Sequence, residues 1–397
     1  MIKPHGSDAL NPLYVEDDAK RAKLVKEAEG LPSIKISSAA AGNAVMLGSG
    51  YFNPLTGYMK KADALAVAKD MRMTNGLFWP TPVLSMVEDA STIKGAKRIV
   101  LLDPNIDGNP VLAIQDVEAV EEYTDDEMKM MTLKVFGTDD PKHPGVQAFN
   151  SVGKIGIAGP IQVLNYSYFA TDFPDTFRTA VQIRKRMEEL GWNKVVAFQT
   201  RNPMHRAHED LVKIAMEAVK ADGAVIHMLL GKLKSGDIPA NVRDAAIRKM
   251  VELYFEPNTA LITGYGFDML YAGPREAVLH AIFRQNMGCS HLIVGRDHAG
   301  VGDYYGAFDA QTIFDNISSD DLLIEIFRGD HTAYSKKLGK VVMMGSVKDH
   351  TKDDWVMLSG TKVRDMLAAG QNLPPEFARP EVAQILMKHY QSEAAKG

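Results

Sequence analysis

The sequence has little cysteine: Cys289 is the single one in 397 residues. One thiol cannot form a disulfide within the chain, and it excludes a zinc site built from several cysteines of one chain. The sequence also lacks any run of 18 apolar residues and any apolar signal core near its start, so we expect no membrane partner. These absences together predict a cytoplasmic protein.

The sequence also has no excess of basic residues. Lys and Arg number 45 against 50 Asp and Glu, so the net charge is −5. Proteins that bind nucleic acid through its phosphates usually carry a basic surplus, and we therefore expect no nucleic-acid partner. With 46% hydrophobic and 24% charged residues, the composition is that of a folded globular chain, and its length predicts two or three domains.

Residues 1–170 predict short strands joined by turns. We expect strands at 81–87, 98–102 and 111–117 and a helix at 61–71. Short strands with tight turns and few long helices favour a small, partly closed β structure.

Strands and helices alternate in residues 171–330. Four apolar runs have the length of buried strands: 195–199, 224–230, 260–263 and 291–294. Helical stretches separate them, and this alternation predicts a parallel sheet with crossover helices, an α/β domain of a nucleotide-binding type. Residues 331–397 predict a third, small unit, in which Ser359 caps one helix and Pro380 opens the last.

The densest group of polar side chains runs from Gln199 to His208, where a predicted strand ends and a helix begins. Parallel sheets bind ligands at this edge, and a helix N-terminus favours anions. His205 and His208 share one side of the first turn, and Arg201 can donate two hydrogen bonds to a tetrahedral oxyanion. The neutral donors of this segment are Gln199, Thr200 and Asn202. The pattern favours a phosphate or sulfate site, although a His pair at this spacing is more often structural.

Three further segments carry weaker signals. The glycine-rich stretch 294–302 follows a predicted strand, and the basic segment Ser359–Arg364 starts a helix. The long basic loop 231–243 suits a mobile flap over an anionic substrate. A plain turn, a capped helix and a passive surface loop are the respective alternatives. The absence of GxxxxGK[ST] excludes a P-loop.

The order of these motifs resembles that of the ATP sulfurylase (sulfate adenylyltransferase) family over essentially the whole chain. The resemblance rests on Gln199–His208, which includes the HxxH of the wider nucleotidyltransferase superfamily, and on Gly295–Gly300, Ser359–Arg364 and Tyr51–Tyr58. It implies an α/β protein with a PUA-like β domain at 1–170, a Rossmann-like catalytic domain at 171–330 and a small C-terminal α/β domain at 331–397.

The resemblance also implies a role for each matching residue. Its catalytic residues would be Thr200, Arg201, Asn202, His205 and His208. Sulfate would bind Gln199, Arg201 and the backbone of Ala299. ATP would bind the segment Gln199–Asn202 with His205 and His208, then Gly295, Arg296, Asp297 and His298, with Met343 at the adenine edge.

The implied reaction is ATP + sulfate ⇌ adenosine 5′-phosphosulfate + diphosphate, with Mg²⁺ carried on the nucleotide. Sulfate is already ionised at neutral pH, so the reaction needs no general base. Fixed positive charge and positioning lower the barrier between two anions, and we expect direct in-line displacement at the α-phosphate without a covalent intermediate. The reaction is reversible, and the physiological direction, assimilation or sulfur oxidation, stays open.

The chain departs from family members in two ways. Residues 334–350 hold no cysteine where many bacterial relatives carry a zinc knuckle, so we expect no zinc, with the apolar run Val341–Met344 packing instead. The chain ends at Gly397, and we expect no fused adenylylsulfate kinase domain. The family also implies a homo-oligomer, with a dimer favoured. Two other readings remain: an HxxH nucleotidyltransferase with another acceptor, and a noncatalytic RNA-binding protein with a PUA-like domain.

Overall fold

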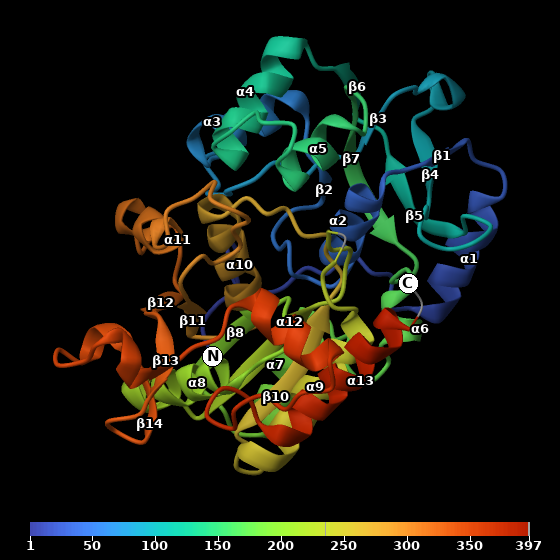
Figure 1. Ribbon diagram of the computed structural model, residues 1–397. Coiled ribbons are helices and arrows are strands. Elements are labelled where there is room, and N and C mark those ends of the chain that lie inside the picture. Colours follow the sequence, from blue (N-terminus) through green and yellow to red (C-terminus); the bar gives the residue numbers. More distant parts are fainter. Residues whose placement is uncertain (235, 396–397) are drawn as a thin grey trace.

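The computed structural model describes residues 1–234 and 236–395, and three regions follow one another along the chain (Figure 1). Our proposed boundaries at residues 170 and 330 fall within α6 and between β12 and β13. Within the described ranges, no helix combines the length and apolarity that crossing a bilayer requires.

The N-terminal region is built on a seven-stranded mixed sheet in the order β1-β4-β5-β7-β2, with β3 and β6 also paired to β7. Its strands are β1 (Ser33–Lys35), β2 (Gly57–Tyr58), β3 (Met86–Val87), β4 (Arg98–Leu102), β5 (Val111–Asp116), β6 (Ala119–Glu122) and β7 (Ile155–Val163). Its helices are α1 (Asp18–Ala28), α2 (Ser38–Gly48), α3 (Lys61–Asp70), η1 (Ser91–Ile93), α4 (Asp125–Phe136), α5 (Pro144–Asn150) and α6 (Phe169–Asp172). Strand β7 pairs with β2, β3, β5 and β6, so it is the strand on which most of this sheet depends.

Two expectations for this region were wrong in part. Of the strand predicted at 81–87, only Met86–Val87 forms a strand, and Pro82 has no N–H to donate to a ladder. The region also holds more helix than its turn-rich strands indicate. Helix α2, for example, is capped by the Ser37 hydroxyl, which accepts from the Ala40 N–H, and its small side chains are almost all buried.

The middle region contains a five-stranded parallel sheet in the order β10-β9-β8-β11-β12. Its strands are β8 (Val195–Thr200), β9 (Gly223–Leu229), β10 (Ala260–Tyr265), β11 (His291–Val294) and β12 (Glu325–Arg328). Its helices are α7 (Ala180–Glu189), α8 (Arg206–Val219), α9 (Ala240–Tyr254), α10 (Pro274–Asn286), α11 (Asp309–Thr312) and η2 (Ile313–Asn316). The predicted parallel sheet is confirmed. The chain builds from β8 to one side and then returns to β11 on the other, which creates a switch point at the carboxyl ends of β8 and β11.

Alternate residues of β8 feed two hydrophobic cores. Val195 and Ala197 join a large core that includes α7, α10 and the N-terminal sheet. Val196 and Phe198 join a second core, which contains residues of α8, α9 and the two C-terminal helices. The sheet is therefore covered on both faces, and its carboxyl edge is where side chains can meet a ligand.

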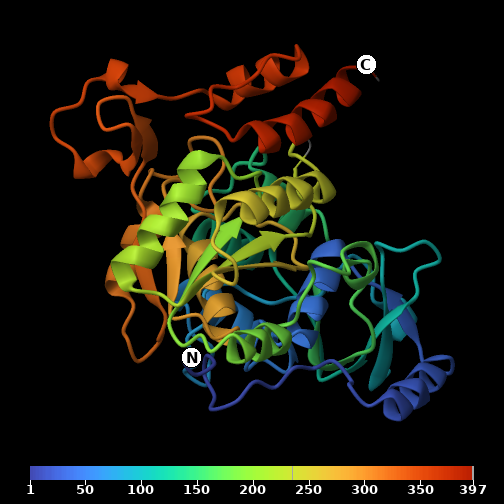
Figure 2. The same ribbon diagram turned by 90° about the horizontal axis from the view of Figure 1, so that it is seen from below.

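The C-terminal region consists of a small antiparallel sheet and two helices, of which α13 lies against α9 and α12 lies against α13 (Figures 1 and 2). Its elements are β13 (Thr332–Ser335), β14 (Lys340–Met343), η3 (Met344–Ser346), η4 (Lys352–Asp354), β15 (Trp355–Val356), α12 (Gly360–Ala368) and α13 (Pro380–Ala394). As predicted, Ser359 caps α12 by accepting from the Lys362 N–H, and Pro380 opens α13. Val341 is buried in this region, and the Ser335 hydroxyl bonds to His350 Nε2 at 2.6 Å.

Candidate functional site

A cavity of about 340 Å³ opens at the carboxyl edge of the parallel sheet, at the switch point between β8 and β11. All the predicted site residues except Met343 line it: Gln199, Thr200, Arg201, Asn202, His205, His208, Gly295, Arg296, Asp297, His298 and Ala299. Met343 pairs in β14 with Thr332, which does line the cavity, but Met343 itself does not. The fold therefore gathers two segments that are about a hundred residues apart in the sequence.

The turn after β8 is held by its own side chains. Thr200 Oγ1 donates to the Asn202 carbonyl at 2.7 Å and accepts from the Asn202 N–H at 3.1 Å. Helix α8 begins at Arg206, four residues after Asn202, so the turn brings Arg201 and the first residues of α8 to the same cavity.

Arg201 joins the two sides of the cavity. Its Nη2 donates to the Gly300 carbonyl at 3.0 Å, and its guanidinium carbon lies 4.9 Å from the centroid of the Tyr271 ring. The other terminal nitrogen, Nη1, is buried and has no hydrogen-bond partner among the described residues. A buried donor without a partner is costly, so this N–H group is a position where a bound anion would restore a hydrogen bond.

His205 and His208 stack on each other at the start of α8. Their ring centroids are 4.0 Å apart, and His208 Nδ1 accepts from the His205 N–H at 3.4 Å. Burial lowers the pKa of His208 to about 4 and the pKa of His205 well below its ordinary value. Both rings are therefore neutral at pH 7 and can offer N–H donors, while the fixed positive charge comes from arginine.

The second wall is the loop after β11. Asp297 and Ala299 have φ of 54° and 55°, in the left-handed region, so the loop turns sharply toward the cavity. The Ala299 carbonyl accepts from the Gly273 N–H at 3.0 Å, whereas the Ala299 N–H makes no hydrogen bond within the described residues. Arg296 and Asp297 pair with each other at 3.2 Å. Arg201 and Ala299 thus both line this cavity, and each has an N–H group without a partner among the described residues.

Glu209, next in sequence to His208, does not line this cavity. It is fully buried and accepts from Arg379 at 2.9 and 2.8 Å and from Lys213 at 2.6 Å. The carboxylate therefore fastens α8 to the C-terminal region.

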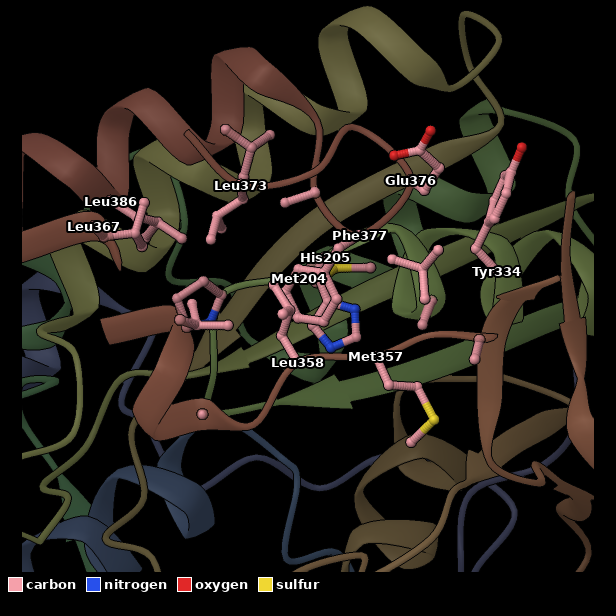
Figure 3. Close-up of a pocket in the computed structure, with 18 of the residues that line it drawn as sticks. Met204, His205, Tyr334, Met357, Leu358, Leu367, Leu373, Glu376, Phe377 and Leu386 are labelled. Atoms are coloured by element: carbon pink, nitrogen blue, oxygen red, sulfur yellow. The ribbon is translucent and has the colours of Figure 1, made fainter. Parts of the chain in front are cut away.

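A second, apolar cavity of about 280 Å³ lies on the other side of His205 (Figure 3). It separates the start of α8 from β13, β15, α12 and α13, and residues of the third predicted motif, such as Gly360 and Arg364, line it. Phe377 lies beside His205 in Figure 3, with the two rings stacked at 4.9 Å and 26°. His205 is thus held between His208 and an aromatic ring of the C-terminal region.

Three polar residues of the lining, Asp330, His331 and Thr332, were not predicted from the sequence. They follow β12, a short edge strand whose sequence Glu-Ile-Phe-Arg carries charge at both ends and gave no apolar run. Asp330 accepts from the His331 N–H and the Gly345 N–H, both at 2.6 Å, so its carboxylate holds the chain where it leaves the parallel sheet.

Two other predicted segments lie away from the cavity lining. Tyr51 and Phe52 of the 51–58 motif are buried in the large core, and the Tyr51 hydroxyl contacts the Arg178 carbonyl and His227 Nε2. In the 231–243 segment, Ser235 lies outside the described residues, and the Lys234 N–H donates to the Tyr271 hydroxyl at 2.8 Å. The closure of that loop over substrate stays a prediction.

Comparison with known proteins decides the family. A family model described as ATP-sulfurylase matches residues 174–389, and one described as a PUA-like domain matches residues 2–166. The sulfate adenylyltransferases of Allochromatium vinosum and Alcanivorax borkumensis are each 67% identical over 393 residues, which cover 99% of this chain and 99% and 98% of the relatives. This chain belongs to the ATP sulfurylase family.

Other ATP sulfurylase relatives agree. The sulfate adenylyltransferase of Thiobacillus denitrificans is 47% identical over 396 residues, covering 100% of this chain and 96% of that relative. A solved structure described as a hexameric APS kinase from Thiobacillus denitrificans superposes with a TM-score of 0.75 at 22% identity, over 98% of this chain and 68% of that one, and shows the same fold. The expected fold class, a PUA-like domain ahead of an ATP-sulfurylase α/β domain, is confirmed.

Proposed function

We propose that this chain is a sulfate adenylyltransferase, which transfers the adenylyl group of ATP to sulfate and releases diphosphate. The observation that carries the proposal is the pair of unused donors, Arg201 Nη1 and the Ala299 N–H, at a cavity that also holds the HxxH histidines. A small tetrahedral oxyanion matches a guanidinium and an amide better than a bulky acceptor does. Family membership and the names of the 67% identical relatives support the same reaction.

In the proposed mechanism, the positioning of the substrates and fixed positive charge lower the barrier to adenylyl transfer. Arg201, Gln199 and the Ala299 amide would hold sulfate, and Thr200, Asn202, His205 and His208 would face the triphosphate. Gly295 to His298 would line the ribose and base, and the backbone near Met343 would meet the adenine edge. A sulfate oxygen attacks the α-phosphorus, the bond to the bridging oxygen of diphosphate breaks, and the charge passes to the leaving group. Donors that are already in place stabilise this charge without rearranging.

We also propose that Mg²⁺ enters as part of MgATP and is not held by the chain. Among residues 1–234 and 236–395, no group of three or more His, Cys, Asp or Glu side chains is arranged to hold a metal ion. The cavity carboxylates are already engaged, Asp297 by Arg296 and Asp330 by two backbone N–H groups. The phosphates of the nucleotide are then the ligands that remain. The absence of a structural zinc in residues 334–350 is part of the same proposal.

The cellular location and the oligomeric state are part of the proposal. We favour the cytoplasm, where ATP is available, and a homodimer as the functional state. A homo-oligomer is in keeping with the solved relative, which is described as hexameric. Light scattering on the purified protein measures the oligomer directly.

The test of the proposed function uses labelled sulfate. With ATP, Mg²⁺ and inorganic pyrophosphatase present, label from sulfate should enter a nucleotide, adenosine 5′-phosphosulfate. Molybdate in place of sulfate should give continuous release of AMP and diphosphate, because the molybdate anhydride hydrolyses. Transfer of the adenylyl group to a larger acceptor, with none to sulfate or molybdate, would instead support the alternative of an HxxH nucleotidyltransferase of another specificity.

A further inference from the structure

Three polar side chains form a line from the cavity into the protein interior. His298 lines the cavity, and its Nε2 lies 3.0 Å from Nδ1 of His280 on α10. His280 Nε2 is buried without a hydrogen-bond partner among the described residues, and the nearest carboxylate oxygen is Oε1 of Glu276, 3.5 Å away and one turn earlier on the same helix. The side chains of Glu276 and His280 are completely buried, so the line connects a cavity residue with an acid that has no access to solvent.

Glu276 is held firmly at the inner end of this line. Its Oε1 accepts from the Leu270 N–H at 3.1 Å, and its Oε2 accepts from the Ala272 N–H at 3.0 Å. Burial raises the pKa of Glu276 to about 7, so the carboxyl group can be ionised or protonated near neutral pH. Its position is therefore constant while its protonation state can change.

Burial, with a smaller contribution from neighbouring positive charges, keeps both histidines neutral. Burial lowers the pKa values of His280 and His298 well below the ordinary value, and Arg284 and Arg201 lower both further. Arg284 Nη1 donates to the His280 carbonyl at 3.3 Å. The other titratable side chains around the line are His143, His227, Tyr265, Tyr271 and Tyr305. Of the three groups in the line, Glu276 is thus the one that gains or loses a proton near neutral pH.

Hydrogen counting links that proton to the cavity. His280 Nδ1 and His298 Nε2 lie 3.0 Å apart, so only one hydrogen fits between them. Each neutral imidazole carries a single N–H, so a hydrogen on one nitrogen of a ring leaves the other nitrogen as an acceptor. When Glu276 is ionised, His280 Nε2–H faces it, His280 Nδ1 accepts from His298 Nε2–H, and His298 Nδ1 is left as an acceptor. When Glu276 is protonated, each hydrogen shifts by one position, and His298 Nδ1 carries an N–H.

We propose that Glu276 and His280 are positioning residues of the adenylyl-transfer site, which set His298 in the tautomer that donates a hydrogen bond toward bound anions. The proposal rests on the proposed function. Anions in the cavity favour the donor tautomer, and the donor tautomer requires the proton on Glu276. Binding of anionic ligand near neutral pH therefore takes up a proton at a carboxyl group that no ligand touches.

Calorimetry of the binding of adenosine 5′-phosphosulfate, without diphosphate, tests this inference. This ligand fills both halves of the site and has no group that titrates near neutral pH. In buffers of different ionisation enthalpy, the wild-type protein should take up close to one proton at about pH 8, where free Glu276 is ionised, and close to none at about pH 6.

We call the line Glu276–His280–His298 the proton relay. Two variants and one control test whether the proton on Glu276 acts through this relay or whether the side chains only fill the interior. Glu276→Gln cannot titrate and His280→Phe breaks the line, so each should abolish the proton uptake, lower kcat/KM about tenfold and remove an ionisation near pH 7 from its pH profile. His227→Phe is the matched control: His227 is another fully buried histidine, on β9, and it bonds to Tyr51 instead of the cavity loop. It should lose stability and keep both the uptake and the profile.

Each outcome bears on the proposal. Uptake that persists in Glu276→Gln, or that is lost equally in His227→Phe, overturns the relay and leaves the proposed function standing. If His280→Phe does not fold, Glu276→Gln carries the same test alone. A wild-type protein that does not bind adenosine 5′-phosphosulfate at all would overturn the proposed function, and the relay with it.

Discussion

The two walls of the cavity both present histidine, but they are supported in opposite ways. On the α8 wall, His205 packs between His208 and Phe377, with an apolar cavity beside it. On the wall after β11, His298 is bonded to His280 and through it approaches a buried acid. The first wall depends on how the C-terminal region packs, and the second on where a proton resides. The same site can therefore respond to the packing of the C-terminal region and to the protonation state of Glu276.

Arg201 is the residue that both walls share, so its loss should have the largest effect. It lies at the end of β8 and donates across to Gly300. Arg201→Ala should reduce turnover by about a hundredfold or more, because a charge-assisted pair of hydrogen bonds contributes roughly 3 kcal/mol to the transition state. Steady-state kinetics on protein with a normal circular dichroism spectrum checks this. Activity within about threefold of the wild type would remove the basis for the sulfate assignment.

The histidines of the α8 wall should come next. His205→Ala or His208→Ala should lower kcat/KM about thirtyfold, the loss expected for one hydrogen bond to a charged phosphate, with a small change in Tm. Asparagine at either position should recover part of the activity, because a neutral N–H donor survives. Strong destabilisation with normal kinetics would mean that the pair is structural.

The ion pairs that attach the C-terminal region to α8 are predicted to contribute to the free energy of unfolding. Arg379→Ala leaves the buried Glu209 carboxylate with Lys213 alone and should reduce the free energy of unfolding by about 2 kcal/mol. Chemical denaturation measures it. The double variant with Glu209→Gln should regain part of the loss, because no buried charge then lacks its partner. An equally unstable double variant would argue that the Arg379 guanidinium matters more for its contact with the Tyr254 ring than for its pairing with Glu209.

The smallest predicted effect on activity is that of Phe377→Leu, which tests whether the two walls act independently. Phe377→Leu removes the ring behind His205 and should lower kcat/KM about tenfold, through a less well-held imidazole. Leu373→Val, at the same apolar cavity, is the matched control and should change stability without changing kinetics. Neither variant should alter the pH profile, since the proton relay lies on the other wall. A shifted profile in Phe377→Leu would contradict the separation of the two walls.

Sequence patterns predict some parts of this site well and others hardly at all. The segment Gln199–His208 was predictable because one continuous stretch joins a buried strand, a turn and a helix start. The loop after β11 was predictable for the same reason. Both depend on local order, and the parallel sheet then brings them together at its carboxyl edge.

The supporting residues depend on contacts between distant segments, and sequence patterns do not show these. Glu276 and His280 lie one turn apart on α10, a spacing that is common on exposed helices, yet this helix is buried almost throughout. Phe377 reaches His205 from 172 residues further along the chain. Strand β12 is too short and too polar to predict, and Asp330 and His331 were missed with it.

The most direct test of the account is exchange of labelled diphosphate into ATP, with and without sulfate. Direct displacement by sulfate, with no covalent intermediate, requires that label enters ATP only when sulfate is present. The wild-type protein should show sulfate-dependent exchange, and Arg201→Ala should lose it. Exchange that proceeds equally well without sulfate would reveal an adenylyl-enzyme intermediate and would contradict the account.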